Sequence, residues 1–313
     1  MAALSAGEIA ARPNHRTGAA LAIGAASFIS TLHDTIMKWM SGSYPFHQVQ
    51  TIRCGIALIC VGLYAVYVGN ARSIRTQHWP LAALRGLLLG SASTLFYLAA
   101  VAMPLPEAVA LYFTMPLFVA ALAGPFLGER VSLERWLAVG VGFAGVATIL
   151  RPGTSLFGPA ALLALVAALL YAIGNAVTRP LSVKLAAAPL AFWQNAMYVA
   201  IALALSAAFG TGGLHTDRHV SLDYLTRGWV IPSTPDLVLM IGLGLATGLL
   251  MVLFTTAYHL AETSFVAPFE YSTMLWAVLF SFLVWRQLPD ATALFGILLI
   301  AGSGLFLLAR PDG

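Results

Sequence analysis

The chain has 313 residues, of which 60% are hydrophobic and only 9% are charged, and its mean hydropathy is +0.87. Because soluble domains are about a quarter charged, this composition excludes an ordinary soluble protein. The formal net charge is +4, but Lys and Arg are scattered singly between apolar stretches. A nucleic-acid-binding protein would gather them on one basic face, so we expect a lipid bilayer as the partner and no nucleic acid.

Ten apolar segments follow one another, each near the length of about 20 residues with which a helix crosses a bilayer. They cover residues 18–40, 46–68, 80–102, 107–126, 133–150, 157–178, 189–209, 236–258, 264–285 and 291–309. The sequence therefore predicts an all-α polytopic membrane protein with ten transmembrane helices. Residues 1–17 are too polar for a cleaved signal peptide, so we expect a cytoplasmic segment there and a retained first helix. Residues 210–235 predict an external loop with a short interfacial helix.

The charges of the predicted loops indicate an orientation. With the N-terminus inside, nine Lys and Arg residues lie in inside segments and five in outside segments; Arg53 and Arg85 are left out because they fall within spans. The positive-inside rule then favours both termini in the cytoplasm. We expect a multi-pass protein of a bacterial inner membrane.

The second half of the sequence repeats features of the first at the same spacing. The matches are Asp34 and Lys38 with Asn175 and Arg179, Pro45 and Gln50 with Pro189 and Gln194, Gly86, Gly90, Phe96 and Ala99 with Gly244, Gly248, Phe254 and Ala257, and Arg151-Pro152 with Arg310-Pro311. Each half holds five predicted helices, an odd number, so the halves must enter the membrane in opposite directions. The sequence thus predicts two inverted five-helix repeats, at 18–153 and 154–310. Secondary transporters share this plan and bind substrate near the midplane, between the repeats.

Several glycine patterns favour helix packing over chemistry. Gly140 to Gly145 matches the dinucleotide-binding pattern but lies inside an apolar span, without the strand that such a site needs. The GxxxG patterns at Gly86 and Gly244 allow helices to approach closely. The seven histidines show no metal-ligand spacing, and no Ser/His/Asp set stands out. We therefore expect no enzyme, no cofactor and no metal.

A family resemblance rests on four stretches. They are Asp34 to Trp39, Glu107 to Leu111, Gly128-Glu129-Arg130, and Gly140 to Gly153. Together they resemble the EamA-type branch of the drug/metabolite transporter superfamily, over nearly the whole chain. The resemblance implies ten helices and carriage of small metabolites. Many bacterial members export amino acids, including aromatic ones, and some relatives import larger solutes such as S-adenosylmethionine or riboflavin.

Charged residues inside spans usually face a helix-bundle interior, because burial in lipid is costly. Glu270 lies in the ninth span, two residues after Pro268, and is a candidate for proton coupling or amine binding; a hydrogen-bonded glutamate that joins helices is the structural alternative. Asp34 and Lys38 are four residues apart, so they could pair on one helix face beside His33. Cavity lining and structural pairing both stay open for them.

Other polar and aromatic residues complete the candidate site. Arg53 could bind a substrate carboxylate and Gln50, Gln194 and Asn195 could hydrogen-bond it, although glutamines also join helices. Asn175 matches Asp34 in the second half. The aromatic candidates are Tyr97, Tyr112, Trp193, Tyr271 and Trp276. Aromatic residues usually pack or form interfacial belts; as a set with few charges, these suit a largely apolar cavity for amphipathic metabolites.

A transporter explains this pattern better than a membrane enzyme, which needs a clustered catalytic set, or a channel, which needs a filter loop. We expect a monomer or weak dimer that moves small molecules by alternating access, with helices flexing near Pro116, Pro125 and Pro268. Export of amino acids, including aromatic ones, is the main hypothesis. Uptake of a larger metabolite such as S-adenosylmethionine or riboflavin is the alternative, and protons are the candidate coupling ion.

Overall fold

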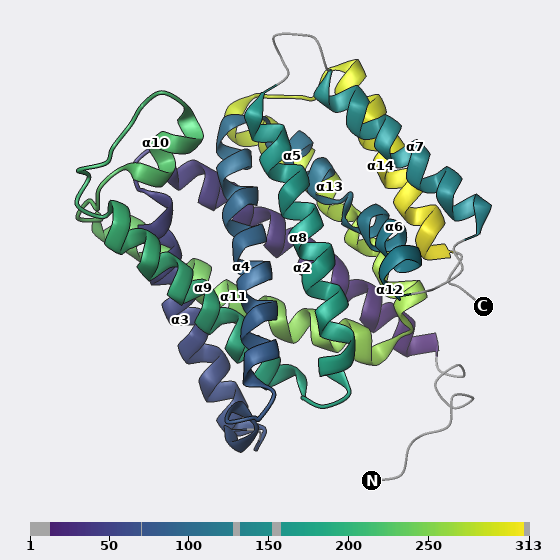
Figure 1. Cartoon of the computed structure of the whole chain (residues 1–313), viewed down its shortest axis with the longest axis horizontal. Helices are drawn as coiled ribbons and strands as arrows, with labels where there is room; N and C mark the ends of the chain where they lie inside the picture. The colour runs from purple at the N-terminus through teal and green to yellow at the C-terminus, as the bar shows by residue number, and fades with distance from the viewer. Residues whose placement is uncertain (1–12, 70, 128–131, 152–157, 310–313) are drawn as a thin grey trace.

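A computed structural model describes residues 13–69, 71–127, 132–151 and 158–309 of the chain (Figure 1). Those residues form helices and contain no strand. The elements are α2 (Pro13–Met40), α3 (Phe46–Tyr67), the 3-10 turn η1 (Ala71–Ile74), α4 (Trp79–Ala102), α5 (Leu105–Tyr112), α6 (Met115–Leu127), α7 (Leu133–Leu150), α8 (Pro159–Ser182), α9 (Ala187–Phe209), α10 (Val220–Thr226), α11 (Thr234–Leu260), α12 (Thr263–Glu270), α13 (Ser272–Trp285) and α14 (Ala291–Ala309).

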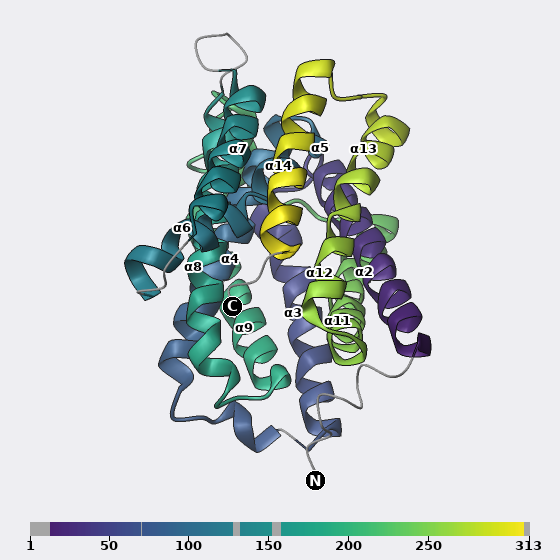
Figure 2. The same ribbon diagram turned by 90° about the vertical axis from the view of Figure 1, so that its right-hand side faces the viewer.

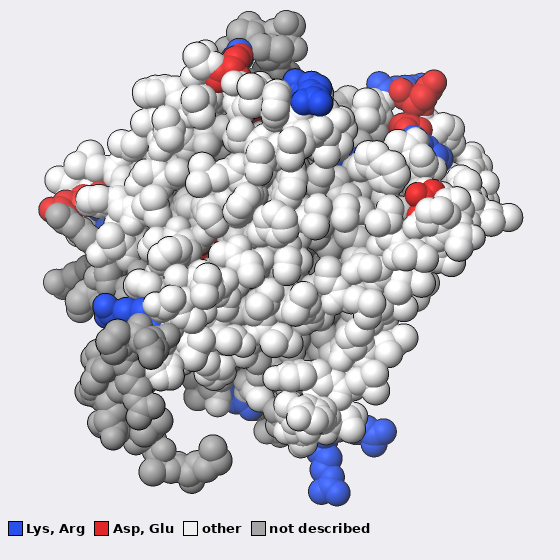
Figure 3. Space-filling view, turned by 180° about the vertical axis from the view of Figure 1, so that it is seen from behind, with Lys and Arg blue, Asp and Glu red and all other residues white. Residues whose placement is uncertain are grey.

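Within the described residues, 10 helical segments are long and apolar enough to cross a membrane, which confirms the predicted number of spans. Their ends agree with the predicted segments to within a few residues. On the face seen in Figure 3, Lys, Arg, Asp and Glu gather toward the margins and uncharged residues fill the centre. Such a surface is suited to a bilayer, whose core excludes charged side chains.

Two of the spans are interrupted, which the sequence did not predict. The fourth span breaks between α5 and α6, where the Thr114 hydroxyl donates to the Leu111 carbonyl at 2.6 Å. The ninth breaks between α12 and α13, at Tyr271. Pro116 and Pro268 lie close to the two breaks and lack the N–H that would continue the helical ladder. Transporter sites are often formed at discontinuous helices of this kind.

Helix packing is related between the two halves. The pair α4 and α8 corresponds to α11 and α2, and the pair α4 and α9 corresponds to α11 and α3. Two further pairs, α7 with α14 and α3 with α9, each join equivalent spans; Figure 2 shows α7 and α14 side by side. These are the pairs expected if the two halves are structural repeats. The inverted orientation of the halves in the bilayer stays a prediction.

Glycines allow close approach of the backbones in several of these helix pairs. A Cβ on Gly86 of α4 would lie 2.9 Å from the Trp193 carbonyl oxygen of α9, and a Cβ on Gly244 of α11 would lie 2.6 Å from the Arg53 carbonyl oxygen of α3. The GxxxG patterns thus pack helices, as predicted. Within the dinucleotide-like pattern, Gly145 of α7 approaches the Gly296 carbonyl of α14 in the same way.

The segment between α9 and α11 differs from the predicted surface loop, because part of it is buried. It contains the expected short helix, α10, at the upper left of Figure 1. Tyr224 of α10 is 1% exposed, and the Ser221 hydroxyl donates to the Leu98 carbonyl at 2.6 Å. Gln48 exchanges two hydrogen bonds with the backbone of Val230. The segment therefore caps one end of α3 and α4.

Candidate functional site

A polar cluster is buried among the first three spans, near the capped end. Its centre is Arg53 of α3, which is 4% exposed. Arg53 Nε donates to Gln50 Oε1 at 2.8 Å, and Arg53 NH1 lies 2.9 Å from His33 Nε2. Three residues that the sequence proposed separately are thus in direct contact.

Tyr97 and Asp34 extend the cluster. The Tyr97 hydroxyl donates to Asp34 Oδ1 at 2.8 Å and lies 3.3 Å from His33 Nδ1. Because a guanidinium can only donate, His33 accepts through Nε2 and carries its proton on Nδ1, toward Tyr97 and Asp34. The Arg53 guanidinium also lies 5.4 Å from the centre of the Tyr97 ring, within cation–π range. The cluster is therefore a connected network with fixed directions.

A second polar cluster lies at the other end of the spans. Arg85 of α4 donates to the Thr178 hydroxyl at 2.6 Å and to Gln194 Oε1 at 2.9 Å. Gln194 in turn donates to the Tyr198 hydroxyl at 3.2 Å. Gln194 thus binds an arginine, as its counterpart Gln50 does in the first half.

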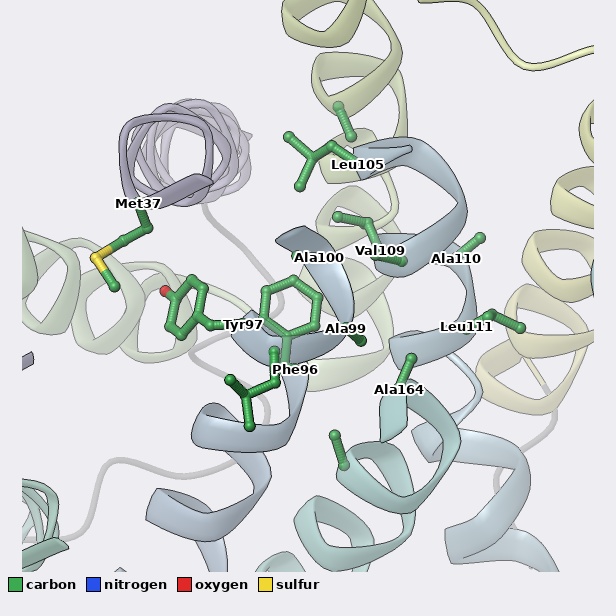
Figure 4. Close-up of a cluster of buried hydrophobic side chains, with 14 of the residues drawn as sticks. Met37, Phe96, Tyr97, Ala99, Ala100, Leu105, Val109, Ala110, Leu111 and Ala164 are labelled. Carbon is green, nitrogen blue, oxygen red and sulfur yellow. The ribbon is translucent and has the colours of Figure 1, made fainter. Parts of the chain in front are cut away.

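Aromatic rings connect the interior between these clusters. Phe96 lies next to Tyr97, with ring centres 5.3 Å apart, and 4.9 Å from the ring of Tyr112. Tyr112 meets Tyr171 of α8 at 5.4 Å, and Tyr171 shares a side-chain hydrogen bond with Asn175. Figure 4 shows Phe96 and Tyr97 side by side on α4. Such faces and edges can contact a planar ring.

The line of aromatic rings formed by Tyr97, Phe96, Tyr112 and Tyr171 also reaches the capping segment between α9 and α11. Phe46 lies 6.1 Å from Tyr97 and 5.7 Å from Tyr224 of α10. The Tyr224 hydroxyl is buried and has no hydrogen-bond partner among the described residues. Tyr224 interacts electrostatically with Arg53 and Tyr97, so its hydroxyl lies close to the first cluster. A buried hydroxyl without a partner is a position where a ligand could bind.

Glu270 lies at the second interrupted span. Its Oε1 accepts a hydrogen bond from the Tyr258 hydroxyl of α11 at 2.5 Å. Glu270 also interacts electrostatically with Tyr171, which joins it to the aromatic line. This hydrogen bond agrees with a carboxylate that takes part in proton coupling or amine binding. It agrees equally with a structural carboxylate that joins α12 to α11.

Asp34 and Lys38 do not pair with each other, which corrects one expectation. Asp34 accepts from Tyr97, whereas Lys38 Nζ donates to the Met103 carbonyl at 2.6 Å and lies 5.0 Å from the Trp285 ring centre. Met103 follows the end of α4 and has an extended backbone, so its carbonyl is available to Lys38. Lys38 lines a surface pocket of about 420 Å³, apart from the cluster.

The remaining candidates lie outside the two clusters. Trp193 donates to the Ile74 carbonyl at 3.0 Å and stacks on Trp79, near the end of the bundle. Asn195 donates to the Ala191 carbonyl of its own helix. Trp276 packs edge-on against Phe28, and Tyr271 packs against Phe113. Glu129 of the family-like stretch lies outside the described residues.

The sequence did not predict four residues that take part in these contacts, namely Arg85, Thr178, Tyr224 and Tyr258. Arg85 had a usable signal, because an arginine within an apolar span is costly and usually faces the protein interior. Tyr224 gave no signal, since it lies in a polar stretch that resembles a surface loop. The two clusters and the rings between them offer cations, hydrogen-bond groups and aromatic faces, which can bind an amphipathic molecule.

Comparison with known proteins gives consistent results. Residues 16–151 match the EamA-like transporter family. The S-adenosylmethionine uptake transporter of Rickettsia conorii is 26% identical over 279 residues, which cover 89% of this chain and 88% of that protein. The riboflavin transporter of Rhizobium johnstonii is 27% identical over 303 residues, covering 96% and 94%. A solved crystal structure shares the fold, with a TM-score of 0.62 and 16% identity over 93% of this chain and 97% of that one.

Proposed function

We propose that this chain, whose residues 16–151 match the EamA-like transporter family and whose described part holds 10 candidate membrane spans, is a transporter that takes up a ring-containing, amphipathic metabolite. The buried Arg53 cluster, joined to the line of aromatic rings, is the observation that carries this proposal. A charged group suits a polar part of the solute, and the rings suit a planar part.

Uptake of a solute such as S-adenosylmethionine or riboflavin has better support than the export of amino acids expected from the sequence. Two relatives that align with most of this chain are described as an S-adenosylmethionine uptake transporter and a riboflavin transporter. Both solutes contain fused planar rings and are larger molecules than an aromatic amino acid. The line of rings from Tyr224 to Tyr171 suits such a solute.

The mechanism we propose is alternating access between two inverted five-helix halves. In the described state, Tyr224 and Ser221 of the capping segment are buried over the ends of α3 and α4, so this end is closed. Release of the cap, together with bending at the breaks beside Pro116 and Pro268, would open it. Glu270 is the proposed proton-coupling residue, and the inner membrane with both termini in the cytoplasm is the proposed location.

Transport into proteoliposomes tests the proposal. Labelled S-adenosylmethionine, riboflavin and tryptophan are offered to the purified protein, with and without a pH gradient. We expect saturable uptake of one of the two larger solutes and weaker uptake of tryptophan. Transport of tryptophan alone would contradict the proposal and support the hypothesis of amino-acid export. No flux of any of the three would contradict the proposed substrate class.

A further inference from the structure

Arg85 is a second arginine within the spans, near the end of the molecule opposite to Arg53. Arg53 comes seven residues after the start of α3, and Arg85 comes six residues after the start of α4. At 1.5 Å per residue, each lies about 10 Å from the beginning of its helix. Because α3 and α4 are consecutive spans and run in opposite directions, the two guanidinium groups approach opposite ends of the bundle.

Both arginines are oriented in the same way. Each donates through Nε and NH1 to neutral groups: Gln50 and His33 for Arg53, Thr178 and Gln194 for Arg85. The two glutamines occupy matching positions in the halves of the sequence, but the arginines do not. Arg53 follows Gln50 on the same helix, whereas Arg85 reaches Gln194 from a different one. The two arginines therefore have similar hydrogen bonds to a glutamine and a second neutral group, although the arginines do not occupy matching positions in the two halves.

The positive charges of both arginines stay available to a ligand. Among the described residues, neither arginine forms an ion pair with a carboxylate, and NH2 of each forms no hydrogen bond. Asp34 acts on Arg53 only electrostatically, because its carboxylate accepts from Tyr97. A guanidinium is always charged and favours planar oxyanions, so one that is buried, as Arg53 is, or half-buried, as Arg85 is, and forms no ion pair can receive a carboxylate.

Tyr198 connects the two positions. It lies one turn beyond Gln194 on α9, accepts a hydrogen bond from it, and interacts electrostatically with both Arg53 and Arg85. Tyr198 therefore lies within electrostatic range of both arginines. A polar hydroxyl at this position would lower the cost of moving an anionic group between them through the apolar interior.

We propose that Arg53 and Arg85 are two anion-binding positions on one path, and that the transported metabolite carries a carboxylate beside its planar rings. Arg53 binds the carboxylate when the protein opens at the capped end, and Arg85 binds it when the opposite end opens. This inference rests on the proposed transport function and narrows its substrate class. A solute with an α-carboxylate and a purine ring fits; a neutral isoalloxazine does not.

The matched test compares a carboxylate with its neutral counterpart. Uptake of S-adenosylmethionine and of its decarboxylated analogue is measured for the wild type, Arg53→Gln, Arg85→Gln and Arg85→Lys, with exposed Arg72→Gln as control. We expect each glutamine variant to lower kcat/KM for the carboxylate about tenfold or more, as for loss of a charge-assisted contact. The decarboxylated analogue should change less than about twofold. Arg85→Lys should be intermediate, because lysine keeps the charge without the planar fork.

A binding measurement keeps the inference testable if no solute is transported. The thermal shift of the purified protein is compared for indole-3-propionate and its neutral amide. A larger shift with the acid, lost in Arg85→Gln and kept in Arg72→Gln, supports the inference even if the proposed transport function fails. Equal shifts with acid and amide overturn it. Equal losses of both S-adenosylmethionine and its analogue in Arg85→Gln also overturn it, because they indicate a structural arginine.

Discussion

Arg53 NH1 donates to Nε2 of His33 across 2.9 Å, and this contact joins the second span to the first inside the bundle. His33 is 6% exposed and is the link between Arg53 and the pair formed by Tyr97 and Asp34. The imidazole therefore positions the guanidinium and leaves its remaining donors free to bind a solute. Two replacements separate this positioning role from simple packing.

We expect His33→Ala to lower uptake and thermal stability together. It removes the acceptor of a buried, charged donor, which costs about 1–3 kcal/mol. His33→Gln should recover part of both, because its amide oxygen can accept from Arg53. Uptake kinetics and thermal unfolding of the purified variants measure the two effects. Equal behaviour of the two variants would show that His33 only fills space.

Tyr224→Phe tests whether the buried hydroxyl of the cap binds the solute. In the described structure this hydroxyl has no partner, so its removal should leave the melting temperature unchanged or slightly higher. Uptake should nevertheless fall several-fold. The control is Tyr44→Phe, because the Tyr44 hydroxyl donates to Asp236 at 2.6 Å and its loss should lower stability. Normal uptake by Tyr224→Phe would exclude Tyr224 from the site.

The fold followed from the sequence more fully than the site did. Span length and hydrophobicity are local properties, and they predicted ten helices. The GxxxG patterns are short and local too, and they predicted the glycine contacts. The breaks beside Pro116 and Pro268 were missed because a proline in a span is compatible with a kink or with an interruption.

The site depends on contacts between distant segments. The sequence identified His33, Gln50 and Arg53 as candidates, but the partners of Lys38 are the Met103 carbonyl and the Trp285 ring. An i,i+4 spacing shows only that two side chains can meet, and a free carbonyl at a helix end competes for the cation. Tyr224 was missed because burial of a polar loop segment depends on what it covers.

Gly244→Ala should destabilise the protein by about 1–3 kcal/mol through overpacking. A Cβ at this position would lie 2.6 Å from both the Arg53 carbonyl oxygen and the Ile56 Cβ, and backbone atoms cannot move aside easily. Gly242→Ala is the matched control on the same helix, since its Cβ would meet nothing within 4 Å. Thermal unfolding of the two variants should differ clearly. Similar melting temperatures would contradict the close packing of α11 on α3.

Asp290→Asn should lower the thermal stability of the protein near neutral pH, and this difference from the wild type should disappear in acid. A hydrogen bond from Arg151 and the N–H of Ala293 lower the pKa of Asp290, which lies outside the spans. A lowered pKa contributes stability above the ordinary value of about 3.9, and this contribution is lost as the pH falls through the lower folded value. The wild type should therefore lose its advantage over the variant below about pH 4. A constant difference in melting temperature down to pH 3 would contradict this.

Glu270→Gln tests proton coupling at the second interrupted span. Glutamine keeps the shape and can still accept from Tyr258, but it cannot release a proton. We therefore expect solute exchange to persist while stimulation of uptake by a pH gradient is lost. Glu262→Gln, at the exposed start of the same helix, should keep that stimulation. If Glu270→Gln retains both its rate and its response to the gradient, the glutamate only joins α12 to α11, and the coupling group must be sought elsewhere on the path.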